Sequence, residues 1–395
     1  MTLEQWRQEL ADNFEETVKW RRYLHEHPEP SFEEVETAKY IIEQLESFGV
    51  DTLRTNVGNG YGIVATIKGK HDGPTVALRA DFDALRVKEE VDSVFKSKTE
   101  GVMHACGHDG HTASLLSVAK VLVNHREDLH GNVVLLHQHA EEVLPGGAKS
   151  MVEDGALEDV DYVFGIHLGA EQPLNQVYYN YGFGSANSDT FTMRVQGKGG
   201  HGAAPHDTQD ALTIGTQIVT NLQQIVSRLT DPVKPAVLTF AGFHAGGEAY
   251  NIIADSAEIV GTVRTMHQDI QQLMESKVKT MSAQIAAAYD ATVEVDYTQG
   301  YPSINNTEAE VDRVKAAFLS AFPENEVEEV EGQMGGEDFS YYLLDKPGAF
   351  LRVGAKPPEK EIAYPHHHPK FEIDEQALLR SGEVFLTIIN SYLTH

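Results

Sequence analysis

The sequence reads Met103-His104-Ala105-Cys106-Gly107-His108-Asp109-Gly110-His111 between a predicted buried strand, Thr75 to Ala80, and a predicted helix, Thr112 to Asn124. Cys106 is the only cysteine among the 395 residues, and histidines stand two and five positions after it. A thiolate and imidazoles at this spacing suit a transition metal such as Zn²⁺, Mn²⁺, Co²⁺ or Ni²⁺. Because α/β proteins bind ligands where strands end and helices begin, the stretch predicts a metal site on an α/β fold. A thiol beside surface histidines is the alternative.

Two further predicted strands deliver polar residues to the same edge of the sheet. The apolar run 132–138 leads into Glu141 and Glu142, and the run 161–166 ends in His167. Continuous apolar runs are typical of parallel strands that are buried on both faces, and the carboxyl ends of such strands collect ligands. The residues expected to reach one crevice are Cys106, His108, Glu142 and His167.

A third source of imidazole lies near the C-terminus, where Tyr364-Pro365-His366-His367-His368-Pro369 holds three consecutive histidines. Taken alone, such a run is equally compatible with a polar loop. The sequence does not by itself decide which of the three histidines would bind a metal ion.

Charge and composition exclude several classes of partner. The formal net charge is −29, from 31 basic and 60 acidic residues, which argues against binding to nucleic acid or to an anionic membrane. A local arginine can still bind a small anionic substrate at short range. We find no apolar run of about 18 residues, the length needed to span a membrane, and no signal-peptide pattern at the N-terminus. With a single cysteine, the expected location is a reducing cytoplasm.

The order of predicted elements indicates two parts, one inserted into the other. A helix is expected from Leu3 to Glu26, and a capping box of Ser31 and Glu34 is expected to open a second helix that ends at Gly49. Strands and helices then alternate to about Gly182, as in a parallel or mixed sheet.

From Ser188 the pattern becomes strand, helix, strand, strand, helix, strand, which is typical of a split βαβ sandwich. The predicted fold class is therefore α/β: a mixed sheet flanked by helices, with an inserted βαββαβ, ferredoxin-like lid domain. The predicted bounds are 1–186 and 298–395 for the metal-binding catalytic domain and 187–297 for the lid and dimerisation domain.

Short motifs follow one another in a defined order along nearly the whole chain. They are His27-Pro28 with Phe32-Glu33-Glu34, Arg79 to Leu85, the Cys106 segment, Ala140-Glu141-Glu142, His167-Leu168-Gly169, Gly197 to His201, Gly261 to Arg264, Gly335 to Phe339, and His367 to Phe371. In this order and spacing the chain resembles the dinuclear-metal aminoacylase and carboxypeptidase family. The most similar branch holds bacterial N-acyl-amino-acid amidohydrolases, hippurate hydrolases and plant auxin-conjugate hydrolases.

The resemblance implies a role for individual residues and a pair of divalent transition-metal ions, of Mn, Zn, Co or Ni, in each chain. The implied metal ligands are Cys106, His108, Glu142, His167 and His367, the last because the family's ligand lies two residues before the proline. Glu141 matches the general base, and His201 matches a lid histidine that reaches the scissile carbonyl, in many relatives from the neighbouring subunit. Asn251 and Arg264 match contacts to the substrate carboxylate. A homodimer or higher homo-oligomer is the implied assembly.

The implied reaction is metal-dependent hydrolysis of the amide bond of an N-acyl amino acid to a carboxylic acid and a free amino acid. A dipeptidase or carboxypeptidase would differ in its acyl pocket, and an inactive metal-binding relative would be expected to lack Glu141 or a ligand. Arg86, His139 and Ala254 stand where proline is common in the family. The identity of the substrate is therefore not transferred.

Overall fold

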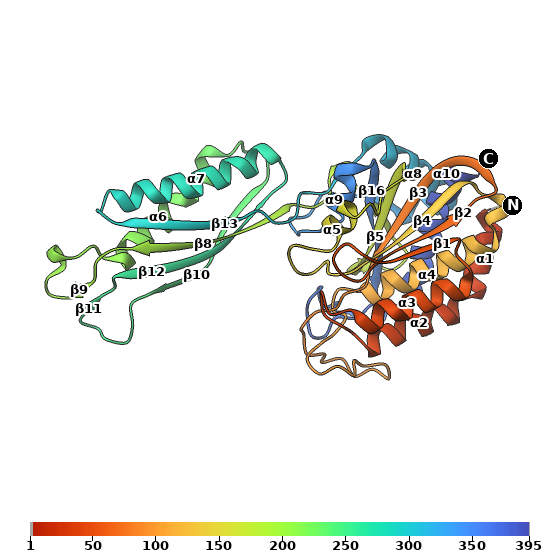
Figure 1. Ribbon diagram of the computed structural model, residues 1–395, viewed down its shortest axis with the longest axis horizontal. Helices are drawn as coiled ribbons and strands as arrows, with labels where there is room; N and C mark the ends of the chain where they lie inside the picture. The colour runs from red at the N-terminus through yellow and green to blue at the C-terminus, as the bar shows by residue number, and fades with distance from the viewer. Residues whose placement is uncertain (1–2, 395) are drawn as a thin grey trace. The chain divides into compact units, whose positions relative to one another are not determined.

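A mixed sheet forms the centre of the first part of the protein in the computed structural model, which describes residues 3–394. Within that range the sheet has eight strands in the order β1-β2-β4-β3-β5-β16-β6-β15 (Figure 1). Their bounds are Thr52–Val57 for β1, Gly62–Lys68 for β2, His71–Asp81 for β3, His130–Gln138 for β4, Tyr162–Pro173 for β5, Val177–Tyr179 for β6, Val327–Glu329 for β15 and Gly348–Lys356 for β16. Strand β3 is parallel to β4 and β5, and β5 is parallel to β16. The carboxyl ends of these central strands therefore reach the same edge.

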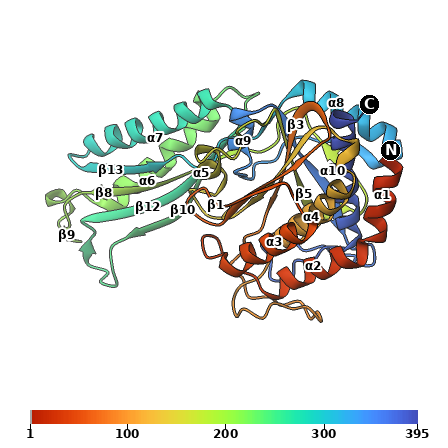
Figure 2. The ribbon, with the colours of Figure 1, turned by 45° about the vertical axis from the view of Figure 1, so that its right-hand side comes forward.

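Helices cover both faces of this sheet because successive strand residues point to opposite sides. Val76 and Leu78 of β3 belong to the larger core, whereas Ala77 belongs to a second core on the other face. The helices over the larger core, several of which Figure 2 shows beside the sheet, are α1 Leu3–Asp12, α2 Phe14–Glu26, α3 Val35–Phe48, α4 His108–Asn124, α8 Glu308–Ala321 and α10 Gln376–Leu393. Residues of α5, Ala148–Glu153, and α9, Ser340–Asp345, line the second core.

Two local predictions near the N-terminus are wrong. The helix expected from Leu3 to Glu26 is divided at Asn13, whose carbonyl accepts the N–H groups that start α2. The capping box is also absent, because Ser31 Oγ donates to Asp83 Oδ2 at 2.7 Å and the Glu34 carboxylate accepts the N–H of Ala140 at 2.8 Å. Neither side chain therefore caps α3. The expected end of that helix at Gly49 is confirmed, in the left-handed conformation that glycine favours.

The second part of the protein is a four-stranded antiparallel sheet with helices. Its strands follow the order β10-β12-β8-β13, and neighbouring strands are all antiparallel. The elements are β8 Asn187–Gln196, α6 Ala211–Gln224, β10 Ala236–Ala245, β12 Ser256–Thr265, α7 Gln268–Ala287 and β13 Thr292–Thr298, with a short ribbon of β9 Gly200–His201 and β11 Ile252–Ile253. The helix predicted over 210–229 ends in a π-helical turn at 225–229. The predicted fold class, including the βαββαβ order, is confirmed.

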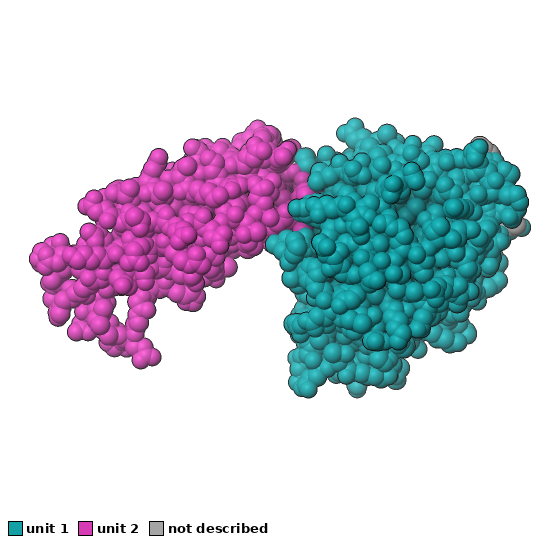
Figure 3. Space-filling model, in the orientation of Figure 1, with its two compact units in different colours: residues 1–184, 304–331, 338–395 teal, residues 185–303, 332–337 magenta. Residues whose placement is uncertain are grey.

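The chain divides into two compact units, coloured separately in Figure 3. Unit 1 comprises residues 1–184, 304–331 and 338–395, and unit 2 comprises 185–303 and 332–337. The predicted domain bounds and the roles of catalytic and lid domain stay predictions. Among the described residues, no helix is both long enough and apolar enough to cross a membrane.

Candidate metal centre

The loop before α4 presents Cys106 and His108 to the carboxyl edge of the sheet in unit 1. Gly107 lies between them with φ +93°, a conformation that residues with a Cβ rarely adopt. This turn lets α4 begin at His108, two residues after Cys106. Cys106 is only 8% exposed, and its Sγ lies 3.5 Å from His167 Nε2 and 3.7 Å from His366 Nδ1. The loop therefore brings the thiol to the histidine that β5 supplies.

All five predicted ligands lie together in unit 1. Among the described residues, five groups of three side chains have potential ligand atoms within 4.8 Å of one another; three of these groups hold two or more of the predicted ligands, and Cys106 belongs to two of the three. These groups are Cys106 with His108 and His167, Cys106 with Glu142 and His367, and His108 with Glu141 and Glu142. The arrangement joins soft, imidazole and carboxylate donors from four segments of the chain.

Buried carboxylates hold His108, the predicted ligand on α4. His108 Nδ1 lies 3.1 Å from Asp83 Oδ1 and 3.0 Å from the backbone carbonyl oxygen of Asp83. Because Asp83 engages Nδ1, the other ring nitrogen, Nε2, is left to face the cluster. Burial disfavours the imidazolium form, but the carboxylates of Asp81 and Asp83 outweigh it and raise the pKa of His108 to about 10. A site with so much negative charge around a histidine attracts a cation, which would displace the proton.

Asp81 orients a second histidine and is itself held by a buried arginine. Its carboxylate accepts from His111 Nδ1 at 2.6 Å and from Arg79 Nη1 at 2.7 Å. The other ring nitrogen of His111 accepts the N–H of Leu168 at 2.9 Å. Because both nitrogens of His111 are engaged in this way, His111 positions the neighbourhood of His167 rather than offering a ligand atom.

The donor set fits a divalent transition metal. His108 Nε2 and Glu142 Oε1 are buried without a hydrogen-bond partner among the described residues, and buried polar atoms ordinarily have one. Burial, followed by the Glu142 carboxylate, raises the pKa of the Cys106 thiol well above its usual range. Burial, followed by the electrostatic effect of the neighbouring His111, holds the pKa of His167 well below its usual range, so its imidazole stays neutral. A neutral imidazole is the form that ligates metals.

The C-terminal loop adds two histidines, of which the sequence analysis selected one. His367 Nε2 lies 3.3 Å from Glu142 Oε2, and its backbone N–H donates to Ala105 O at 2.8 Å. Its φ of +68° is unusual for a residue with a side chain and is typical of constrained functional positions. The contact of His366 with Cys106 was not predicted. Only the turn of the loop brings it there, and no spacing in the sequence signals it.

The residues predicted to contact the substrate from the lid lie in unit 2. His201 and Asn251 are neighbours, because β9 pairs with β11 and Gly202 donates to the carbonyl of Asn251 at 2.8 Å. His201 is exposed, and its Nδ1 accepts the N–H of Ala203 at 3.0 Å. The neutral ring therefore carries its proton on Nε2, which is available as a donor.

Arg264 lies at the opposite end of this sheet. The β9–β11 ribbon joins β12 near Ser256, and Figure 1 shows the ribbon at one end of the sheet of unit 2. Arg264 is eight residues further along β12, opposite Ser188, which corresponds to about 27 Å of extended strand. Within one unit 2, His201 and Arg264 are therefore too far apart to contact the same small molecule.

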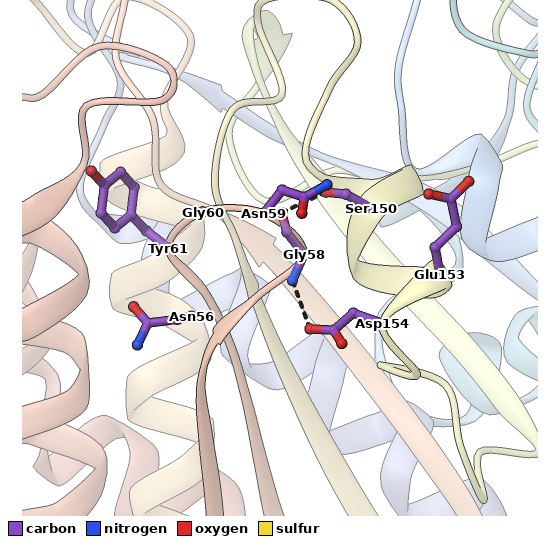
Figure 4. A pocket seen from close by; sticks show the side chains of 8 residues that line it. All are labelled: Asn56, Gly58, Asn59, Gly60, Tyr61, Ser150, Glu153 and Asp154. Carbon is purple, nitrogen blue, oxygen red and sulfur yellow. Dashed lines mark hydrogen bonds between the residues drawn. The ribbon is translucent and has the colours of Figure 1, made fainter.

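A separate polar pocket lies between the β1–β2 turn and α5 in unit 1 (Figure 4). Its lining residues are Asn56, Gly58, Asn59, Gly60, Tyr61, Ser150, Glu153 and Asp154. The turn is tied to the helix by Gly58 N–H, which donates to Asp154 Oδ2 at 3.0 Å. None of the predicted site residues lines this pocket.

Comparisons with known proteins place this geometry in context. The profile of Peptidase family M20/M25/M40 matches residues 77–391. An N-acyl-L-amino acid amidohydrolase of Geobacillus stearothermophilus is 43% identical over 311 residues, covering 78% of this chain and 83% of the relative. Thermostable carboxypeptidase 1 of Saccharolobus solfataricus is 39% identical over 377 residues, which cover 94% of this chain and 95% of the relative. The structure of the Bacillus subtilis YXEP protein, described as a dinuclear metal binding peptidase, matches with a TM-score of 0.82 at 33% identity. The match covers 96% of this chain and 98% of the YXEP chain.

Proposed function

The chain belongs to peptidase family M20/M25/M40, as its motifs predicted, and from that premise we propose that it hydrolyses N-acyl amino acids. The products are a carboxylic acid and a free amino acid. The observation that carries the proposal is the cluster of thiol, imidazole and carboxylate groups in which Glu141 stands beside the ligands. Amide hydrolysis requires a carboxylate at that place to act as general base, whereas metal storage does not require one.

We propose that Cys106, His108, Glu142, His167 and His367 hold two divalent ions, of Mn, Zn, Co or Ni. Cys106 is common to two of the ligand groups, which supports two ions and not one. When bound, such ions supply Lewis-acid chemistry, because they lower the pKa of water from about 15.7 to about 7 and polarise a carbonyl oxygen. The single cysteine and the absence of a membrane-spanning helix among the described residues are compatible with the proposed cytoplasmic location.

The protein's own residues divide the remaining work. Glu141 Oε2 lies 4.0 Å from His108 Nε2, at the edge of the ligand cluster and 7% exposed. It takes the proton of the attacking water and delivers it to the nitrogen of the leaving amine. His201 donates from Nε2 to the oxygen on which negative charge develops. Asn251 and Arg264 contact the α-carboxylate of the amino-acid half, where a guanidinium can form a paired contact.

The distance along β12 supports a shared site between two copies of the chain. Arg264 and the pair of His201 and Asn251 lie at opposite ends of one sheet, so a small substrate that contacts both requires two unit 2 domains. We therefore propose a homodimer or higher homo-oligomer in which one chain supplies the arginine and its partner supplies the histidine.

A carboxypeptidase or dipeptidase is the second candidate, and the 39% identity to a carboxypeptidase favours it. Both reactions use the same ligands and the same base. They differ in whether the acyl side of the substrate carries a free amino group.

The experiment that tests the proposal is a hydrolysis screen of the metal-loaded protein. Acetyl-, benzoyl-, indoleacetyl- and aminoacyl-amino acids are offered, and the release of free amino acid is measured. We expect turnover of N-acyl amino acids that disappears after chelation and returns on addition of Mn²⁺, Zn²⁺, Co²⁺ or Ni²⁺. Hydrolysis confined to aminoacyl substrates would favour the dipeptidase, and full activity in metal-free protein would contradict the proposed mechanism.

Replacement of Arg264 by alanine is expected to raise KM for substrates with a free α-carboxylate and to leave their carboxamide analogues nearly unaffected. The half-buried guanidinium of Arg264 donates to two backbone carbonyl oxygens of unit 2, Val263 O at 3.1 Å and Asp189 O at 3.5 Å. It thus retains donors for a carboxylate ligand. Steady-state kinetics on each acid and its amide measure the difference, with Arg194→Ala on the neighbouring strand as the control. Equal losses for acid and amide would make Arg264 a structural residue.

A further inference from the structure

Ala140, which precedes Glu141, has an unusual backbone conformation. Its φ is +51°, in the left-handed region that residues other than glycine rarely adopt. The residue is fully buried. Such strain persists only where surrounding contacts hold it, and it is concentrated at functional sites. The direction in which Glu141 leaves the backbone therefore depends on what holds Ala140.

The side chain of Glu34 holds it. This carboxylate is 0% exposed, and its Oε1 accepts the N–H of Ala140 at 2.8 Å across 106 residues of chain. Glu34 stands at the N-cap position of α3, but its side chain makes no capping hydrogen bond there. Capping of the helix, the ordinary role of an acidic residue at a helix start, thus does not account for the burial of Glu34.

The contact is part of a clamp on both sides of the general base. Two residues after Ala140, the N–H of Glu142 donates to Asp83 Oδ2 at 3.0 Å. The carbonyl of Ala140 accepts the N–H of Gly147 at 3.0 Å. Buried carboxyl groups therefore accept the N–H groups on either side of Glu141. Asp83 also contacts the predicted ligand His108, whereas Glu34 is bound to the backbone of Ala140.

We infer that Glu34 is a positioning residue, which holds the left-handed turn at Ala140 and thereby directs Glu141 toward the reacting water. The inference rests on the proposed role of Glu141. Burial, followed by the charge of Asp83, raises the pKa of Glu34 to about 8, so the neutral form predominates near pH 7. Glutamine is therefore the close mimic of this side chain, because its carbonyl can accept from Ala140 without a charge.

The test compares Glu34→Gln, Glu34→Asp and Glu34→Ala in the metal-loaded full-length protein. We expect Glu34→Gln to retain kcat within a few-fold. Aspartate is one methylene too short to reach Ala140, and alanine has no acceptor, so both should lose about 10–10²-fold in kcat, the size expected for a displaced catalytic group. KM and metal content should stay near the wild-type values. Glu33→Ala is the matched control, because Glu33 is the adjacent glutamate, is exposed, and pairs with Arg86 at the surface.

The outcomes decide between positioning and general stability. If Glu34→Ala does not fold, the comparison of glutamine with aspartate answers the same question. A Glu34→Gln variant as impaired as Glu34→Asp, or a folded Glu34→Ala variant with kcat within twofold of wild type, would overturn the inference.

A second measurement does not depend on any activity. Ala140→Gly removes the strain, because glycine adopts φ +51° readily. We expect the fall in Tm caused by Glu34→Ala to be smaller in the Ala140→Gly background than in wild type, in both metal-free and metal-loaded protein. Additive changes in Tm would refute the link between Glu34 and the turn. Absence of amidohydrolase activity in the wild type would instead refute the proposed function, and the Tm comparison would still decide the role of Glu34.

Discussion

Glu141→Gln is expected to lower kcat by about 10²–10⁴-fold, the range typical of a lost general base, while metal content and KM stay near those of the wild type. Glutamine has nearly the same shape but cannot accept the proton of the attacking water. Glu141 lies at the edge of the ligand cluster in the buried turn that follows β4. Its replacement should therefore leave the set of ligands intact. Steady-state kinetics and elemental analysis of the same preparation measure the two effects separately.

Glu142→Gln is the matched control, because it makes the same chemical change one residue later. Glu142 Oε2 lies 3.3 Å from His367 Nε2, and its Oε1 is buried without a partner among the described residues. This variant should lose metal as well as activity, since an amide is a much poorer ligand than a carboxylate. If Glu141→Gln instead loses metal, or keeps a wild-type kcat, then Glu141 is not the base.

His201→Ala is expected to lower kcat by about 10²–10³-fold, the loss typical of one donor to a developing oxyanion, and the activity should be recoverable by mixing subunits. If His201 acts on the partner's site, a heterodimer of His201→Ala and Glu141→Gln chains contains one site with both residues intact. Random pairing makes half of the dimers heterodimers, each with one functional site of two, so about a quarter of wild-type activity should return. Activity is measured before and after the two inactive variants exchange subunits.

The control for this experiment mixes Glu141→Gln with Glu142→Gln. Both defects lie in unit 1, in the same turn, so no arrangement of the two chains creates an intact site and no activity should return. Failure of the His201→Ala mixture to recover, with exchange demonstrated by differently tagged chains, would place His201 in the site of its own chain or remove it from the reaction.

The elements that carry the predicted ligands could be predicted because their signals are local. Runs of apolar residues marked β3, β4 and β5, and the spacing of Cys106 and His108 marked the turn into α4. The position of His367 two residues before a proline selected it among three histidines through the resemblance. In each case the evidence lies within a few consecutive residues, where periodicity and spacing are visible in the chain.

Predictions failed where a side chain had a choice between a local and a distant partner. Ser31 and Glu34 have the spacing of a capping box, yet they bind Asp83 and Ala140, which are 52 and 106 residues away. Likewise, the approach of His366 to Cys106 spans 260 residues. A capping rule weighs only local contacts, and here buried partners from the loops that follow β3 and β4 compete successfully with the helix end.

The sequence by itself determined the α/β architecture, the inserted βαββαβ segment, the family and the identity of the candidate ligands, because periodicity, motif order and donor chemistry are properties of the chain. Only the tertiary structure decided how those residues are held. It placed carboxylates behind His108, put Ala140 into a left-handed turn on Glu34, and separated His201 from Arg264 by the length of β12. These are contacts between segments far apart in sequence, and burial sets their energies. A buried polar group must find its partner wherever the packed fold provides one.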